Sequence, residues 1–95
     1  MTKRTTATNP IEYSDFVFHG RVGYLSKDIV VDFPGYKVSC KVSGSVRKNG
    51  DEYDDLFIRL SHISPRDSHG FITITDKDRE WLNHEIVNYL YSILL

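Results

Sequence analysis

Hydrophobic and polar residues alternate strictly between residues 36 and 47. The hydrophobic positions of this stretch are Tyr36, Val38, Cys40, Val42 and Val46. The positions between them are basic or hydroxyl-bearing, namely Lys37, Ser39, Lys41, Ser43, Ser45 and Arg47. Successive side chains of a strand point to opposite faces, so this period of two predicts a strand with one face on a core and the other in water.

Shorter patterns predict the strands that follow. Asn49-Gly50 favours a type I′ hairpin turn, after which residues 56–63 are predicted to form the return strand. The inward side chains of that strand are expected to be Leu56, Ile58 and Leu60. Residues 64–70 have the composition of a loop, and residues 71–75 that of a last short strand.

The strands before the alternating stretch are interrupted by glycines. Between residues 16 and 24 four hydrophobic residues share one parity, which predicts a strand with a bulge or a close backbone approach at its glycines. These four residues are Phe16, Phe18, Val22 and Tyr24. Residues 29–33 are predicted to form a second strand, which Pro34-Gly35 ends in a turn.

The period changes to about 3.6 after Thr75, which predicts an amphipathic helix over residues 76–95. Thr75 followed by Asp78 matches a capping box in its Asp form. The main hydrophobic stripe is predicted to consist of Leu82, Ile86, Tyr89 and Ile93. Four further residues widen the apolar sector to about 200°, well beyond the roughly 100° that a helix on one sheet face needs. These further residues are Val87, Leu90, Tyr91 and Leu94.

Together these elements predict an α+β fold, in which an antiparallel β-meander of four to six strands carries one C-terminal α-helix packed on one face. A chain of 95 residues forms one domain, and we assign residues 11–95 to it. Residues 1–10 are rich in threonine and end at a proline, so they are predicted to form a flexible N-terminal tail.

Composition narrows the classes of function without choosing one. The net charge of −1 lacks the basic excess of proteins that bind nucleic acid mainly through phosphates. A single cysteine, Cys40, excludes an intramolecular disulfide and a multi-cysteine zinc site. The N-terminus has no apolar signal segment and the chain no apolar run of about 18 residues, so a cytoplasmic protein is expected.

Catalytic and metal-binding chemistry is only weakly indicated. No G-x-S-x-G, P-loop or G-x-G-x-x-G motif occurs, so we assign no catalytic residue and no cofactor and do not expect an enzyme. His62, Asp67 and His69 combine two imidazoles with a carboxylate, which are ligand types of an open metal site. With the acidic residues 51–55, they are the candidates for a metal-dependent hydrolase, the second alternative. For residues 51–55 a solvated, mobile turn is the simpler interpretation.

A nucleic-acid-binding face is the first alternative. Lys37, Lys41 and Arg47 share the polar side of the alternating stretch, with Tyr36 close by. Basic residues interleaved with aromatic ones on a sheet can hold a phosphate backbone and stack bases. Lysines on an exposed strand also protect a sheet edge from aggregation, so these basic residues have a structural explanation that needs no nucleic acid.

The helix favours a different function, that of a small non-enzymatic protein–protein interaction protein of the accessory or inhibitor type. Its surplus apolar surface predicts partner-binding residues at Trp81, Val87, Leu90, Tyr91 and Leu94. Trp81 lies on the polar arc, where it either anchors an interface or folds back under the N-terminal segment. A two-fold homodimer through the helix is expected, because this is the commonest closed assembly. Short chains without motifs also suggest an origin in a phage or mobile element.

Overall fold

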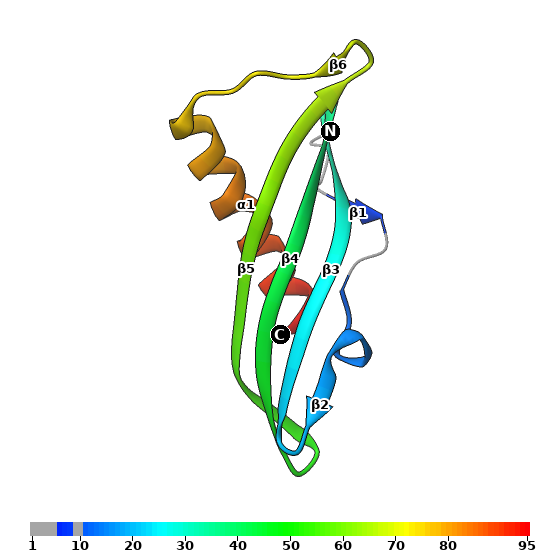
Figure 1. The fold of residues 1–95 in the computed structure, drawn as a ribbon, viewed down its shortest axis with the longest axis vertical. Coiled ribbons are helices and arrows are strands. Elements are labelled where there is room, and N and C mark those ends of the chain that lie inside the picture. Colours follow the sequence, from blue (N-terminus) through cyan, green and yellow to red (C-terminus); the bar gives the residue numbers. More distant parts are fainter. Residues whose placement is uncertain (1–5, 9–10) are drawn as a thin grey trace.

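A single antiparallel sheet with a helix behind it makes up the fold (Figure 1). The structure, a computed structural model, describes residues 6–8 and 11–95, which form six strands, one 3-10 turn and one helix. In chain order these are β1 (Thr6–Thr8), η1 (Tyr13–Asp15), β2 (Val17–His19), β3 (Val22–Phe33), β4 (Tyr36–Asn49), β5 (Glu52–Asp67), β6 (Gly70–Phe71) and α1 (Asp76–Leu94). The predicted α+β meander with a C-terminal helix is therefore confirmed.

The three long strands β3, β4 and β5 form the body of the sheet, with β4 in the centre. Burial along β4 alternates as the sequence predicts, so one side of this strand lies in the core. The buried side chains of β4 are Val38, Cys40, Val42 and Val46. The rest of the core comes mainly from Leu25, Ile29 and Val31 of β3, Ile58, Leu60 and Ile63 of β5, and Leu82, Ile86 and Leu90 of α1. All of these lie between the sheet and α1, so the other face of the sheet stays outside the core.

The segment from residue 16 to residue 24 differs from its prediction. It contains β2 and the start of β3, which pair with each other across a tight turn at Gly20 and Arg21. Phe18 packs against the core, whereas Tyr24 is exposed on the opposite face. The predicted common parity is wrong, because the two-residue turn pairs His19 with Val22. Odd-numbered residues of β2 therefore share a face with even-numbered residues of β3.

The first strand region is also longer than predicted. β3 runs without interruption from Val22 to Phe33 and includes the strand predicted over residues 29–33. Three residues of the predicted N-terminal tail, Thr6–Thr8, form β1 and pair with Val30–Asp32. The remainder of that tail lies outside the described residues.

The β4–β5 hairpin is shifted by one residue from its prediction. Asn49 pairs with Glu52, so the two loop residues are Gly50 and Asp51. Of these two, only Gly50 has a positive φ, of 66°, which fits a type II′ turn and not the predicted type I′ turn. β5 then continues to Asp67 through most of the predicted loop, and residues 72–75 are not a strand.

Two β-bulges decide which side chains of β5 reach the core. Asp55 and His62 have positive φ angles of 54° and 56°, and the register between β4 and β5 shifts at both places. Each bulge sets two residues of β5 against one of β4, which moves the inward parity by one. Leu60 therefore points inward before the second bulge and Ile63 after it. Asp and His adopt this backbone conformation more readily than β-branched residues do.

The helix α1 covers the outer edge of β5 as well as one face of the sheet (Figure 1). Arg79 Nη1 donates a hydrogen bond to the Ile63 carbonyl at 2.7 Å. The Tyr91 hydroxyl accepts one from the Ile58 N–H at 2.9 Å and donates one to the Leu56 carbonyl at 3.4 Å. A free strand edge exposes unpaired N–H and C=O groups that invite aggregation. α1 therefore provides β5 with hydrogen-bond partners that a neighbouring strand would otherwise supply.

The buried side of α1 is rotated from the predicted stripe. Leu82, Ile86 and Leu90 are buried, whereas Ile93 is 40% exposed and Tyr89 half-buried. This rotation turns the wide apolar sector toward β5, so that it spans the sheet face and the sheet edge together. The width of the sector therefore has an explanation within the fold itself.

Replacing Tyr91 with Phe is expected to lower the free energy of unfolding by about 1–2 kcal/mol, because it leaves the Ile58 N–H of the β5 edge without its partner. Urea denaturation followed by circular dichroism measures this change. Tyr24→Phe is the matched control, because it removes the same hydroxyl from an exposed ring. Equal stability of the two variants would contradict the role of Tyr91 at the edge.

Candidate functional site

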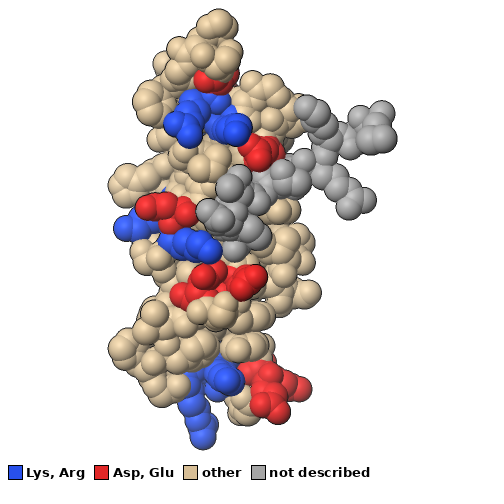
Figure 2. All heavy atoms as spheres, turned by 90° about the vertical axis from the view of Figure 1, so that its right-hand side faces the viewer, with Lys and Arg blue, Asp and Glu red and all other residues tan. Residues whose placement is uncertain are grey.

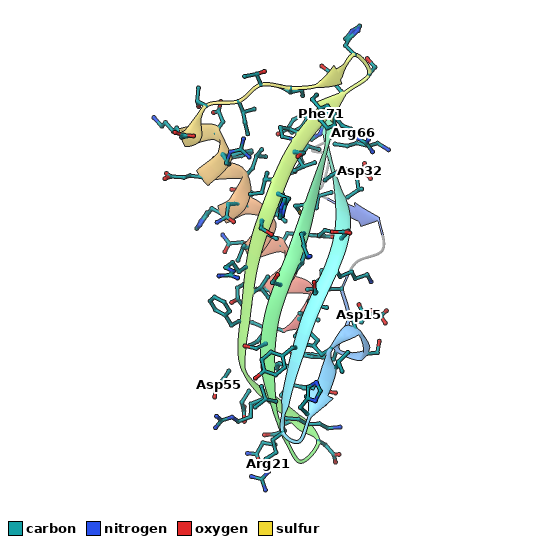
Figure 3. All side chains as sticks on the ribbon, viewed as in Figure 1. Asp15, Arg21, Asp32, Asp55, Arg66 and Phe71 are labelled. Atoms are coloured by element: carbon teal, nitrogen blue, oxygen red, sulfur yellow. The ribbon has the colours of Figure 1, made fainter. Side chains whose placement is uncertain are left out.

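No described element covers the sheet face opposite α1, and we call it the open face. In Figure 1 it faces the viewer. Its side chains are Val17 of β2, Tyr24, Ser26, Asp28, Val30 and Asp32 of β3, Lys37, Ser39, Lys41, Ser43, Ser45 and Arg47 of β4, and Asp54, Phe57, Arg59, Ser61, His62, Ser64 and Arg66 of β5. Asp32, Arg66 and Phe71 mark one end of this face, and Arg21 and Asp55 lie toward the other (Figure 3).

A row of exposed hydrophobic side chains crosses the open face at right angles to the strands. Val17 pairs with Tyr24, Tyr24 with Ser45, and Ser45 with Phe57. Val17 is 63% exposed, and Tyr24 and Phe57 are each 55% exposed. Two strand spacings set Tyr24 and Phe57 about 10 Å apart, with only Ser45 between them. The row therefore forms a shallow trough with aromatic walls and a serine floor.

Charged residues of both signs lie next to the trough and along the rest of the face. Lys37 and Asp32 form an ion pair at 3.6 Å, in which both side chains are exposed. Lys41 stands directly opposite Asp28 on the neighbouring strand. Figure 2 shows basic and acidic groups alternating along the side of the molecule that carries β3.

The same alternation continues toward the trough. Arg47 stands opposite Asp54, and Arg59 stands opposite Ser43. Three of the five basic residues of the open face thus have an acidic residue directly across a strand. Such a face has a mixed potential rather than a continuous positive one.

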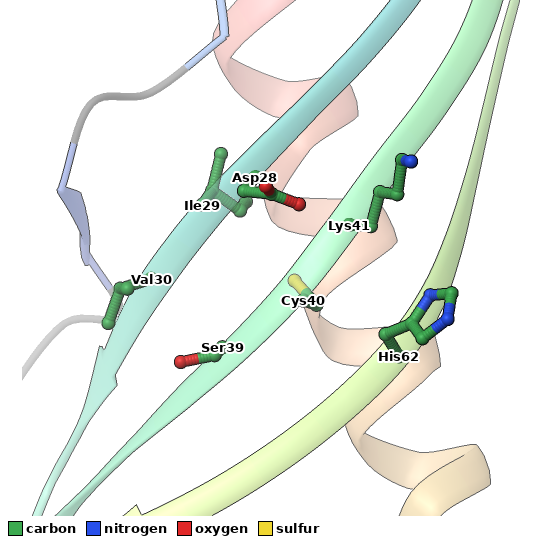
Figure 4. Close-up of a pocket in the computed structure, with 7 residues that line it drawn as sticks. All are labelled: Asp28, Ile29, Val30, Ser39, Cys40, Lys41 and His62. Atoms are coloured by element: carbon green, nitrogen blue, oxygen red, sulfur yellow. The ribbon is translucent and has the colours of Figure 1, made fainter.

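A depression in the middle of the open face brings together residue types that resemble a catalytic set. Asp28, Ser39, Lys41 and His62 line it around Cys40 (Figure 4). Cys40 itself is 4% exposed, and burial, together with the charge of Asp28, raises the pKa of its thiol to about 11. A nucleophilic cysteine needs a lowered pKa. Cys40 is therefore a packing residue of the core rather than a nucleophile.

The three predicted metal ligands lie apart. His62 occupies a bulge of β5, where its Nδ1 is 3.1 Å from the Ser61 hydroxyl. Asp67 accepts a hydrogen bond from the His69 N–H at 2.8 Å at the β5–β6 turn. Five residues of extended strand place His62 and Asp67 roughly 16 Å apart. Within the described residues no three His, Cys, Asp or Glu side chains are placed to hold one ion, the acidic residues 51–55 included.

The residues predicted for nucleic-acid binding are only partly brought together. Lys37, Lys41 and Arg47 lie on the open face as predicted. Tyr36 lies on the core side, where its ring stacks on that of Phe33 at 5.1 Å between centroids. Tyr36 therefore cannot act together with the three basic residues.

Reasoning from the sequence did not single out Tyr24 and Phe57 of the trough, nor Arg59 beside it. Phe57 and Arg59 alternate with the inward residues of β5, so the period of two contained the signal that they point outward. The direction of Tyr24 does not follow from the hydrophobic pattern, because the two-residue turn at Gly20 and Arg21 changes the parity between β2 and β3 without a change in that pattern.

Four of the five residues predicted for partner binding on α1 lie wholly or partly in the core. Leu90 is fully buried, so it is not part of a partner surface. Val87, Tyr91 and Leu94 are half-buried and pack against the core. Trp81 alone of the five is well exposed, at 52%.

Trp81 forms one wall of a pocket at the start of α1, which we call the Trp81 pocket. The pocket has a volume of about 220 Å³. Its lining residues are Tyr36, Pro65, Ile72, Ile74, Asp78, Trp81 and Leu82. The Trp81 ring lies 6.3 Å from that of Phe33, so the start of the helix contacts the β3–β4 hairpin. This pocket is the second candidate surface.

No protein-family model, curated protein or solved structure matches the chain. Among the described residues, the open face and the Trp81 pocket are the two candidate surfaces. Within the described residues, no helix is long and apolar enough to cross a membrane.

The raised pKa of Cys40 predicts a loss of stability at high pH. Below pH 9 the thiol is protonated in the folded and the unfolded chain. Between pH 9 and about 11 the unfolded chain releases a proton that the folded protein retains. The free energy of unfolding is therefore expected to fall by about 2–3 kcal/mol across this range.

Urea denaturation at several pH values measures this loss in the wild type and in Cys40→Ala. Tyrosines titrate in both proteins, so the difference between their slopes isolates the thiol. The slope is expected to be shallower in Cys40→Ala, and parallel slopes would contradict the assignment.

Proposed function

We propose that the protein is a non-enzymatic interaction protein that binds a protein partner on its open face. The exposed row formed by Val17, Tyr24 and Phe57 carries this proposal. Large hydrophobic side chains on a surface otherwise built of serines and charges mark an interaction site. Aromatic and arginine residues are also the types enriched at the centre of protein interfaces.

The charges next to the row favour a protein over a nucleic acid. A nucleic-acid backbone repeats one charge, and a groove that follows it is continuously basic. On the open face the acidic residues Asp28, Asp32 and Asp54 interrupt the basic ones. A protein surface can match such an alternating pattern by placing opposite charges in register.

Single-stranded nucleic acid is the second candidate for the same face. It is favoured by the two exposed rings, Tyr24 and Phe57, which lie beside Arg47 and Arg59. Aromatic rings on an open sheet face can stack bases, and nearby arginines can contact phosphates. The two candidates differ in how binding responds to salt.

Association of two copies through α1 remains a prediction with a smaller surface than the sequence indicated. The well-exposed hydrophobic residues of that region are Trp81, Ile93 and Leu95. Sedimentation velocity at concentrations of about 100 µM tests it, because the dimeric fraction rises with protein concentration. A single monomeric species there would remove the homodimer from the proposal.

The double variant Tyr24→Thr, Phe57→Thr is expected to lose the partner while keeping the fold, because threonine suits an exposed strand. Immobilised wild type and variant are exposed to extract from the native host, and each captured protein is purified and titrated against both. The partner's affinity is expected to fall at least about 10-fold, or roughly 1.4 kcal/mol, in the variant.

His84→Ala, Asn88→Ala is the matched control, because both side chains are exposed on α1 away from the open face. A partner that binds the open-face variant as tightly as the wild type would overturn the proposal. A fluorescent single-stranded oligonucleotide is titrated in parallel at two salt concentrations. Salt-dependent binding that the open-face variant loses would identify nucleic acid as the ligand instead.

A further inference from the structure

We propose that the Trp81 pocket binds the guanidinium side chain of an arginine that a protein partner presents. The pocket lies at the start of α1 and is separate from the open face. The inference therefore does not depend on the function proposed above, and its test uses other residues.

Two groups that recognise a guanidinium stand together on α1. Asp78 and Trp81 are three residues apart, so their side chains are neighbours on the same side of the helix. A carboxylate accepts two parallel N–H bonds from arginine, and the face of an indole is the best aromatic partner for a cation. Both residues line the pocket, and Trp81 is half-exposed.

The other walls of the pocket suit the aliphatic part of an arginine. Pro65, Ile72, Ile74 and Leu82 supply apolar surface beside Asp78. Arginine buries its methylene groups along apolar surface while its charged end stays near water. A planar guanidinium that stacks and binds in a bidentate way fits this arrangement better than the point charge of lysine.

The carboxylate of Asp78 is available to such a ligand. The ion pairs of the described residues join Lys27 to Asp15 and Lys37 to Asp32, so neither includes Asp78. Arg79, the next residue along, donates to the Ile63 carbonyl.

The charge of this region also favours a cation. Tyr36 and Asp78 both line the pocket, and burial together with the negative charge of Asp78 raises the pKa of Tyr36. Residues 76–80 carry three carboxylates, those of Asp76, Asp78 and Glu80, against the two cations Lys77 and Arg79. Their net charge of −1 exceeds the partial positive charge of about half a unit at the start of α1. A purely apolar ligand would remove water from Asp78 and give it no partner in return, which is unfavourable.

The chain has one tryptophan, so its intrinsic fluorescence reports directly on the pocket. The probes are a short glycine-flanked peptide with one arginine and the same peptide with citrulline, which has nearly the same shape but no charge. A saturable fluorescence change is expected with the arginine peptide, with an affinity at least about 10-fold higher than for citrulline. Equal binding of both peptides would overturn the proposal.

Two variants with the same change of charge distinguish binding in the pocket from a general electrostatic effect of the helix start. Asp78→Asn is expected to weaken binding of the arginine peptide at least about 5-fold, whereas Asp76→Asn, outside the pocket, changes it by less than about 2-fold. Asparagine at position 78 keeps the backbone N–H that bonds to the Thr75 side chain, so the helix start is preserved. Equal losses in both variants would show a field effect and overturn the assignment to the pocket.

Two further probes test the identity of the cation. Choline that binds more tightly than the arginine peptide would indicate a small quaternary ammonium ligand instead of a protein side chain. A norleucine peptide that binds more tightly would indicate an apolar ligand. Either result overturns the proposal.

Discussion

The outer edge of β5 is the constraint on which the rest of the structure depends. This strand is 16 residues long, and β6 pairs with only Arg66 and Asp67 at its end. Arg79 and Tyr91 of α1 bond to three further backbone groups of this strand, the Ile63 and Leu56 carbonyls and the Ile58 N–H. The helix is therefore held in place both by hydrophobic burial and by the hydrogen bonding of an edge strand. Non-directional packing alone would not fix its position along β5.

This position of α1 decides which surfaces remain for a partner. To reach Leu56 and Ile63 on the edge, the helix turns its broad apolar sector over β5, where Val87 and Tyr91 pack against the core. The opposite edge of the sheet, on β3, pairs with β1 near one end and with β2 near the other. What the fold leaves exposed is mainly the open face and the corner around Trp81.

The sequence predicts those parts of the structure in which one pattern determines the outcome. The side-chain directions of β4 follow from a strict alternation over twelve positions, and the structure confirms them. The bulges at Asp55 and His62 could not be predicted, because no glycine marks them and the shift appears only when β5 is aligned with β4. The sequence therefore does not predict which side chains of β5 point to the core after His62.

The width of the helix's apolar sector follows from the sequence, but the surface that covers it does not. Helical angles show how much surface is apolar, but they do not show whether a sheet face, a sheet edge or another molecule covers it. Tyr91 illustrates the difference, since its hydroxyl bonds to β5 while its ring packs on the core. The sequence pattern alone predicts the same residue as part of a partner surface.

The floor of the trough is the remaining feature that the fold does not explain. Ser43 and Ser45 follow one another on the open side of the central strand, where β-branched or aromatic residues would stabilise a sheet better. The large side chains, Tyr24 and Phe57, stand on the flanking strands instead. If stability alone shaped this face, the larger residues would be expected in the centre. Small residues there and large ones beside them leave room for a side chain from another molecule, which is why we place the partner on this face.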